Sequence, residues 1–173
     1  FVYEKGLPYL LRAIPIVARQ CPAAVFVLAG EHSNVAGGSI LAELEGLLRV
    51  HKNKKRVILL GNVPYDRLPE FYSACDALVL PSIDPLEAFG IVQIEAMYCG
   101  TPVVATSLPG VRVPVMKTGM GIIVPPRDEK KLAEAIVRIV KNKKQYIKER
   151  STIISQFGSR KSIEQYERAL CEA

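Results

Sequence analysis

Two glutamates, Glu87 and Glu95, have the type and spacing that best suit the binding of a polar ligand. They lie eight positions apart, on either side of Phe89 and Gly90. Glu95 stands among apolar neighbours in a predicted short helix, and an ionised carboxylate in such surroundings needs hydrogen-bond donors. Two adjacent sugar hydroxyls would supply those donors. Glu95 therefore predicts a ligand that carries sugar hydroxyls; the alternative is that it forms the polar edge of an amphipathic helix and faces water.

The helix expected to begin near Gly90 would place free backbone N–H groups beside the two glutamates. The first turn of a helix leaves several N–H groups without partners, and these suit a phosphate. Lys5, which precedes Gly6 at the start of the first expected helix, would bring an ammonium to such a site. A sugar diphosphate would satisfy both features. The alternative is that Lys5 and Glu87 are solvated surface charges.

Short apolar runs alternate with amphipathic stretches along the chain, which predicts parallel βαβ units. Because the runs are apolar throughout, both faces of the sheet should be covered. We therefore expect an α/β fold, a doubly wound parallel sheet followed by C-terminal helices, as a single domain over residues 1–173. Strands are expected at 25–29, 57–60, 77–80, 102–105 and 121–124, and helices at 7–17, 40–50, 66–73, 90–98, 130–141, 143–155 and 159–171, with Asp66, Asp128 and Ser159 as N-caps.

In doubly wound sheets, ligands bind beyond the carboxyl ends of the strands. The segments that follow expected strands are 30–32, 61–63, 81–90 and 106–110. Glu87, Phe89 and Gly90 fall in this set without further assumption. His32 would also face a ligand there, and the Pro109-Gly110 turn would allow a close backbone approach.

Composition narrows the classes of partner. The net charge is +6, and basic residues gather at 51–56 and 141–150. No aromatic residues alternate with these charges, so we do not expect nucleic acid as a partner. Solvated helix ends, or attraction to an anionic membrane surface, remain as explanations of the charge.

The four cysteines form no CxxC pair and no metal-ligand spacing, which favours reduced thiols, a cytoplasmic protein and no metal. No signal peptide or run of about 20 apolar residues is present, and the absent initiator Met suggests a fragment.

The central run resembles a known family. EAFGIVQIEAM at 87–97, followed by GTPVVAT at 100–106, is similar to the E-x7-E signature of retaining glycosyltransferases of family 4, often called group 1. The EKG tripeptide at 4–6, LGNVP at 60–64 and GIIVP at 121–125 agree in order. The resemblance covers nearly the whole chain. It implies the Rossmann-like C-terminal half of a GT-B fold, with the N-terminal acceptor-binding domain absent from this chain.

The resemblance also implies roles for individual residues. Lys5 would hold the diphosphate and Glu87 would touch the donor hexose, which makes them the candidate catalytic residues. Glu95 would bind the ribose hydroxyls. The other implied contacts are backbone N–H groups of Phe89, Gly90 and Ile91 at the sugar phosphate, and Asn62, Val63 and Leu68 beside the base.

The implied reaction moves a hexose from a nucleoside-diphosphate sugar to an acceptor hydroxyl with retention of configuration. It needs no metal or other cofactor, because a lysine and a helix start can stabilise the leaving diphosphate. The implied partners are the nucleotide-sugar donor and the N-terminal acceptor-binding domain. The fragment alone is expected to bind nucleotide weakly and to be inactive.

Three departures from the family pattern stand out. The arginine that usually precedes the lysine would lie before Phe1 or is absent, residues 31–38 replace a short Gly-rich turn, and Pro109-Gly110 replaces Gly-Gly.

Two other functions remain open. One is a sugar phosphorylase or a disaccharide or glucan synthase of the same fold, and the other is a non-catalytic module that binds nucleotide or a lipid surface.

Overall fold

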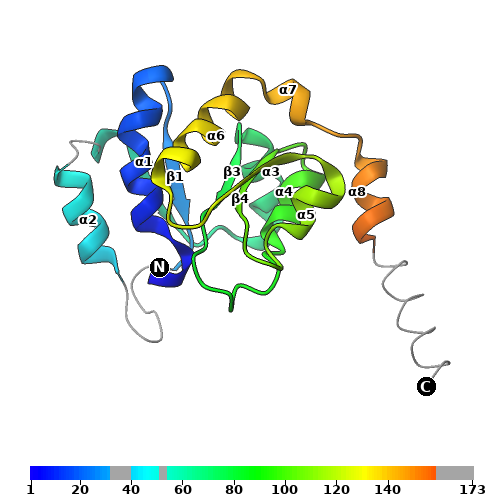
Figure 1. Cartoon of the computed structure of the whole chain (residues 1–173), viewed down its shortest axis with the longest axis horizontal. Coiled ribbons are helices and arrows are strands. Elements are labelled where there is room, and N and C mark those ends of the chain that lie inside the picture. The colour runs from blue at the N-terminus through cyan, green and yellow to red at the C-terminus, as the bar shows by residue number, and fades with distance from the viewer. Residues whose placement is uncertain (32–39, 51–53, 159–173) are drawn as a thin grey trace.

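The computed structural model describes residues 1–31, 40–50 and 54–158 (Figure 1). His32, Gly37, Gly38, His51 and the helix expected at 159–171 lie outside these residues. The described helices are η1 (Tyr3–Lys5), α1 (Leu7–Gln20), α2 (Leu41–Val50), η2 (Lys54–Arg56), η3 (Tyr65–Arg67), α3 (Leu68–Ala74), α4 (Val92–Tyr98), α5 (Val113–Thr118), α6 (Glu129–Lys141), α7 (Lys143–Tyr146) and α8 (Arg150–Phe157), and the strands are β1 (Phe26–Ala29), β2 (Val57–Gly61), β3 (Leu78–Leu80), β4 (Val103–Thr106) and β5 (Gly121–Val124).

The described strands form parallel ladders in two hydrogen-bonded groups. β1 pairs with β2, and β4 lies between β3 and β5. In the larger group Val104 stands opposite Val79 on one side and Ile122 on the other. Each parallel pair needs a crossover, and helices supply it, as in α4 between β3 and β4. This is the parallel α/β arrangement that the alternating sequence predicts.

Helices cover both faces of β3, β4 and β5, as their apolar sequences predict. The expectation of two covered faces is wrong for β1 and β2, where Val27 is 37%, Ile58 49% and Leu60 48% exposed. On one face, α1, α2 and α6 pack over a core that includes Phe26, Leu28, Val104 and Val124. On the other face, α4, α5 and α8 pack over Leu80, Val103 and Ala105. Successive residues of β4 therefore point into different cores, and all of β4 is buried. The doubly wound arrangement is confirmed.

Two expected helix starts differ from the structure. The helix expected at 66–73 begins at Leu68, behind the 3-10 turn η3, and Asp66 does not cap it. The helix expected from Gly90 begins at Val92, because Gly90 adopts a left-handed conformation with φ +71°. Asp128, by contrast, does cap α6, where its Oδ1 accepts a hydrogen bond from the Lys131 N–H at 2.9 Å.

Two further differences concern short helices. The expected helix at 143–155 is divided into α7 and α8, because Ile147 is extended with φ −69° and ψ 132°. Helix α5 was not expected, since its six residues are too few to show a helical period and include Pro114 in the first turn. Within the described ranges, no helix combines the length and the apolar character required to cross a membrane.

Candidate functional site

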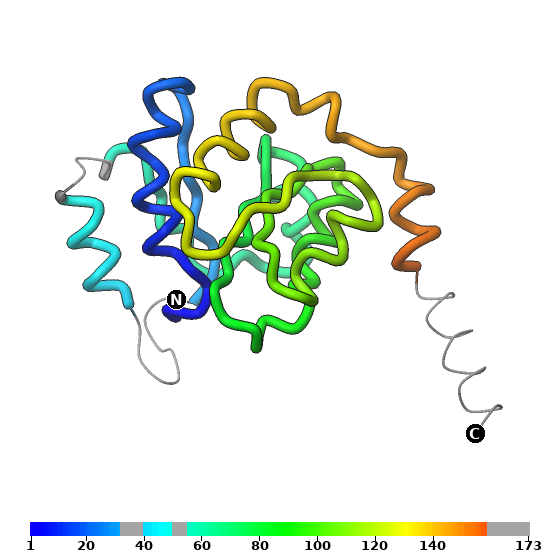
Figure 2. Tube along the Cα trace, in the orientation of Figure 1, coloured from blue at the N-terminus to red at the C-terminus, as the bar shows by residue number. Residues whose placement is uncertain are grey.

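The start of α1 is fastened to the segment that follows β3. The Ile83 N–H donates to the Glu4 carbonyl at 2.9 Å. Gly6 lies against the Pro81 carbonyl, where an added Cβ would stand 2.0 Å from the oxygen, and its φ is +68°. Glycine meets both requirements because it has no Cβ. In Figure 2 the blue N-terminal segment accordingly runs beside the green segment after β3, which places Lys5 at the carboxyl end of that strand.

This arrangement brings two predicted site residues into contact. The Lys5 ammonium forms an ion pair with Oε2 of Glu87. The Glu87 side chain is 16% exposed and the Lys5 side chain is 51% exposed, so the pair is open to solvent on the lysine side. The Ser82 hydroxyl lies 3.4 Å from the same Glu87 oxygen. We call residues 81–91 the Glu87 loop.

Glu95 has a different partner, one that we did not predict. The phenolic O–H of Tyr72, on α3, donates to Oε2 of Glu95 at 2.8 Å. Tyr72 is buried and Glu95 is half-buried. Burial raises the pKa of Tyr72, and the hydrogen bond to Glu95 raises it further. The carboxylate therefore has a fixed donor on one oxygen and keeps acceptor capacity for a ligand.

The residues between the two acids present backbone rather than side chains. Within the described ranges, the N–H groups of Phe89, Gly90 and Ile91 have no hydrogen-bond acceptor. Gly90 is buried, whereas the Ile91 side chain is 66% exposed. The Phe89 ring packs edge-on against Phe157 at 5.8 Å between centroids. These three N–H groups therefore keep their capacity to donate a hydrogen bond.

The three residues predicted beside the base lie on two segments. Leu68 begins α3 one turn before Tyr72, so both side chains lie on the same side of that helix. Asn62 and Val63 follow β2, and Nδ2 of Asn62 donates to a Glu31 carboxylate oxygen at 3.1 Å. Leu68 therefore shares a helix face with Tyr72, the partner of Glu95, whereas Asn62 is joined to the residue after the end of β1.

Several residues of the site could not be found from their sequence neighbours. The signal for Tyr72 was the unmet need of Glu95 for a donor. Ser82 had no signal. Gly110, whose turn would allow a close backbone approach to a ligand, lies against the Ala88 carbonyl, where a Cβ would come within 1.6 Å of the oxygen.

The basic residues of 141–150 make contacts within the domain. Nζ of Lys143 donates to the Cys75 carbonyl at 2.7 Å. The Lys141 ammonium lies 3.4 Å from the Gln20 amide oxygen, and the Arg150 guanidinium lies 5.7 Å from the centre of the Tyr98 ring. These contacts fit solvated helix ends. Attraction to an anionic membrane surface stays a prediction.

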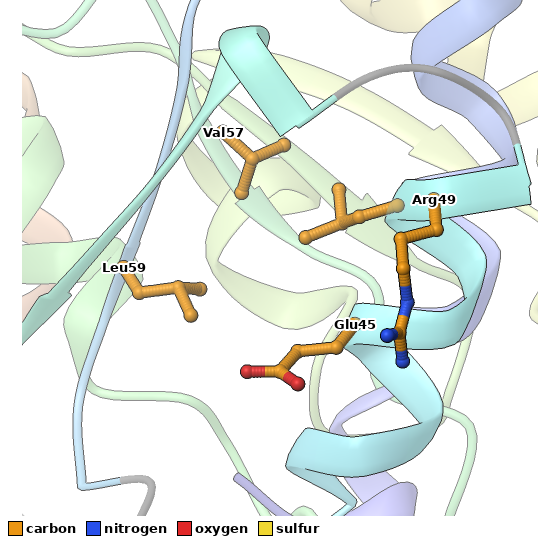
Figure 3. A pocket seen from close by; sticks show the side chains of 5 residues that line it. Glu45, Arg49, Val57 and Leu59 are labelled. Carbon is orange, nitrogen blue, oxygen red and sulfur yellow. The ribbon is translucent and has the colours of Figure 1, made fainter.

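A pocket of about 210 Å³ lies elsewhere, between α2 and β2. Leu48, Val57 and Leu59 line it, with Glu45 and Arg49 projecting from α2 (Figure 3). None of the predicted site residues lines this pocket. Within the described ranges, no group of three or more His, Cys, Asp or Glu side chains could hold a metal ion.

Comparisons with known proteins bear on these observations. A family model described as glycosyl transferases group 1 matches residues 1–156. The chain is similar to D-inositol 3-phosphate glycosyltransferase of Corynebacterium jeikeium, with 34% identity over 139 residues, which are 79% of this chain and 32% of that protein. It thus spans about a third of that curated relative.

Solved structures of other proteins are also similar to this chain over only part of their own length. Sucrose-phosphate synthase of Thermosynechococcus elongatus is 28% identical, with a TM-score of 0.81 over 99% of this chain and 44% of that one. The HepE protein of Anabaena, crystallised with UDP-glucose, is 26% identical, with a TM-score of 0.80 over 100% of this chain and 47% of that one. The match to these two structures thus extends over nearly all of this chain and less than half of each of theirs.

Proposed function

The chain belongs to the group 1 glycosyltransferases, and on this premise we propose that it is the donor-binding domain of an enzyme that transfers a hexose from a nucleoside-diphosphate sugar to an acceptor hydroxyl. The observation that carries the proposal is the contact between Lys5 and Glu87 at the carboxyl end of β3. The binding of UDP-glucose by a relative of the same fold supports the choice of donor.

In this proposal the diphosphate lies between Lys5 and the Glu87 loop. The lysine ammonium has three N–H donors, so it can keep Glu87 and bind a phosphate oxygen at the same time. The free N–H groups of residues 89–91 add donors from the other side. Charge grows on the diphosphate as its bond to the sugar breaks, and fixed donors stabilise that charge.

Glu87 and Glu95 bind the two sugars of the donor. Glu87 is half-buried and is steadied by Lys5 and Ser82, so its remaining lone pairs can accept hydroxyls of the hexose. Glu95 is steadied by Tyr72 and accepts the hydroxyls of the ribose. Leu68, one turn from Tyr72, borders the base, and we also place Asn62 and Val63 beside it.

The reaction forms one bond and breaks one. The acceptor oxygen bonds to the anomeric carbon, the bond from that carbon to the phosphate oxygen breaks, and the acceptor proton leaves with the nucleoside diphosphate or passes to water. We propose that configuration is retained, that no metal is needed, and that the acceptor binds on a separate N-terminal domain. The anomeric signal in an NMR spectrum of the product would test retention.

Calorimetric titration of the chain with UDP, GDP and ADP, and then with their glucose conjugates, tests the proposed ligand. We expect one of the three nucleotides to bind. Glu87→Ala and Glu95→Ala should each weaken the binding of the glucose conjugate of that nucleotide. Binding that is unchanged in both variants would favour a non-catalytic module. For the complete enzyme, turnover that depends on orthophosphate would identify a phosphorylase instead.

A further inference from the structure

Gln93 is a fully buried polar residue of α4, and it lies between the two glutamates in the sequence. Its Nε2 donates to the Phe89 carbonyl at 3.0 Å and to the Val111 carbonyl at 2.9 Å. One side-chain amide therefore joins three segments: the Glu87 loop, the helix that carries Glu95, and the segment after β4.

The orientation of this amide is determined by its neighbours. If the amide were turned over, its oxygen would face two carbonyl oxygens, which repel it. In the orientation observed, Oε1 of Gln93 is buried and has no hydrogen-bond partner within the described ranges. An unpaired buried acceptor lowers stability, and an unbranched apolar side chain would avoid that cost. The same apolar side chain would also remove the donors that Nε2 gives to the Phe89 and Val111 carbonyls, so what the amide contributes at this position is those two hydrogen bonds.

The two loops joined by Gln93 also meet through their backbones. Gly110 lies so close to the Ala88 carbonyl that no side chain fits between them. On the other side, a Cβ on Gly90 would stand 3.0 Å from Nε2 of Gln93 and 2.4 Å from the end of Leu80. The position of the Glu87 loop is thus set at a close-packed junction, and Gln93 supplies the hydrogen bonds across it.

We propose that Gln93 is a positioning residue that fixes the Glu87 loop relative to Glu95, so that the hexose and the ribose of one donor are bound together. The inference rests on the proposed function. Gln93 touches neither sugar and acts through the backbone at Phe89. Such support matters because small displacements of a binding group have large effects on the geometry of the bound substrate.

The consequence is a selective one. Loss of the Gln93 donors frees the Glu87 loop, whereas Glu95 keeps Tyr72, which does not depend on Gln93. Binding of a nucleoside diphosphate, which keeps Glu95 but also uses the N–H groups of residues 89–91, should therefore weaken. Binding of its glucose conjugate should weaken more, because the contribution of the hexose is lost as well. A merely structural role would instead weaken both ligands equally.

The test compares Gln93→Met, which has no N–H donors, with Gln93→Glu, which keeps the shape and loses the pair of donors. Gln145→Glu, at an exposed position of α7, is the matched control. Each chain is titrated with UDP, GDP and ADP and with the glucose conjugate of whichever nucleotide binds, and its thermal midpoint is measured. Gln93→Met decides the test where Gln93→Glu does not fold, because burying an unpaired carboxylate costs far more than burying an apolar side chain.

We expect the ratio of glucose-conjugate affinity to nucleotide affinity to fall by about tenfold in the Gln93 variants, as for one lost charged contact, and to stay unchanged in Gln145→Glu. If the folded Gln93 variants keep the affinity ratio of the wild-type chain, or lose affinity for both ligands equally, Gln93 is not a positioning residue and the proposed function still stands. A wild-type chain that binds none of the nucleotides overturns the proposed function, and this inference with it.

Discussion

The Lys5 ammonium lies on the carboxylate of Glu87, although the two residues are 82 positions apart in the chain. Backbone contacts on both sides make this possible, since Ile83 bonds to Glu4 and Gly6 packs against Pro81. The contact places a cation and an acid together at the carboxyl end of a parallel strand, where α/β domains bind their ligands.

Breaking this ion pair should affect ligand binding more than folding. Lys5 is half exposed, and exposed pairs contribute about 0.2–1 kcal/mol to stability. A double-mutant cycle of Lys5→Ala and Glu87→Ala, followed by urea unfolding, should give a coupling energy in that range. Lys5→Ala should weaken the binding of a nucleoside diphosphate by about 1.5–3 kcal/mol, and Lys5→Arg should weaken that binding less. A coupling energy of several kcal/mol with unchanged binding would indicate a structural pair.

Tyr72→Phe removes only the hydroxyl that donates to Glu95. We expect the free energy of unfolding to fall by about 1.5–3 kcal/mol, as for a hydrogen bond to a charged group. Nucleotide binding should weaken, but by less than in Glu95→Ala, because the carboxylate remains. Urea unfolding and calorimetry on the same samples measure both quantities. Tighter nucleotide binding in the variant would mean that Tyr72 competes with the ligand.

The raised pKa of Tyr72 predicts a loss of stability in alkali. Below the ordinary tyrosine pKa of about 10, both the folded and the unfolded states hold the proton. Above it, the unfolded state releases the proton and the folded state keeps it, so the free energy of unfolding falls as pH rises. Tyr72→Phe should show a shallower fall in alkaline unfolding experiments. Equal slopes for the two proteins would show that the phenol ionises freely in the folded state.

Gly6→Ala should displace the N-terminal segment from the Glu87 loop. An alanine at φ +68° is strained, and its Cβ would overlap the Pro81 carbonyl. We expect a loss of about 1–3 kcal/mol or more in the free energy of unfolding, with weaker nucleotide binding as Lys5 moves. Gly46→Ala is the control, because a Cβ there meets no atom within 4 Å. Equal stability of the two variants would show that the segment is not held as described.

The sequence allowed prediction of the strands and most long helices, because their apolar runs and periods are local properties. The caps and short helices were harder. Asp128 follows a strand and precedes a long amphipathic helix, so its role as an N-cap was evident. The left-handed conformation of Gly90 has no signal in the neighbouring residues. The six residues of α5 are too few to show a helical period.

The site was predictable residue by residue but not contact by contact. The apolar surroundings of Glu95 indicated that it needs a donor, yet they did not identify Tyr72, which lies 23 positions away on another helix. Gln93 is polar and yet fully buried, which its neighbours in the sequence do not indicate. Its partner Val111 lies 18 positions away, and such pairings depend on how the segments pack.

The binding of the ribose by Glu95 can be measured directly. The wild-type chain and Glu95→Ala are each titrated by calorimetry with a nucleoside diphosphate and with its 2′-deoxy form, the base being the one that the wild-type chain prefers. We expect the wild-type chain to bind the ribonucleotide more tightly by about 1.5–3 kcal/mol, and Glu95→Ala to bind both forms equally. A wild-type chain that does not distinguish the two, or a variant that still does, would contradict the assignment of this carboxylate to the pentose.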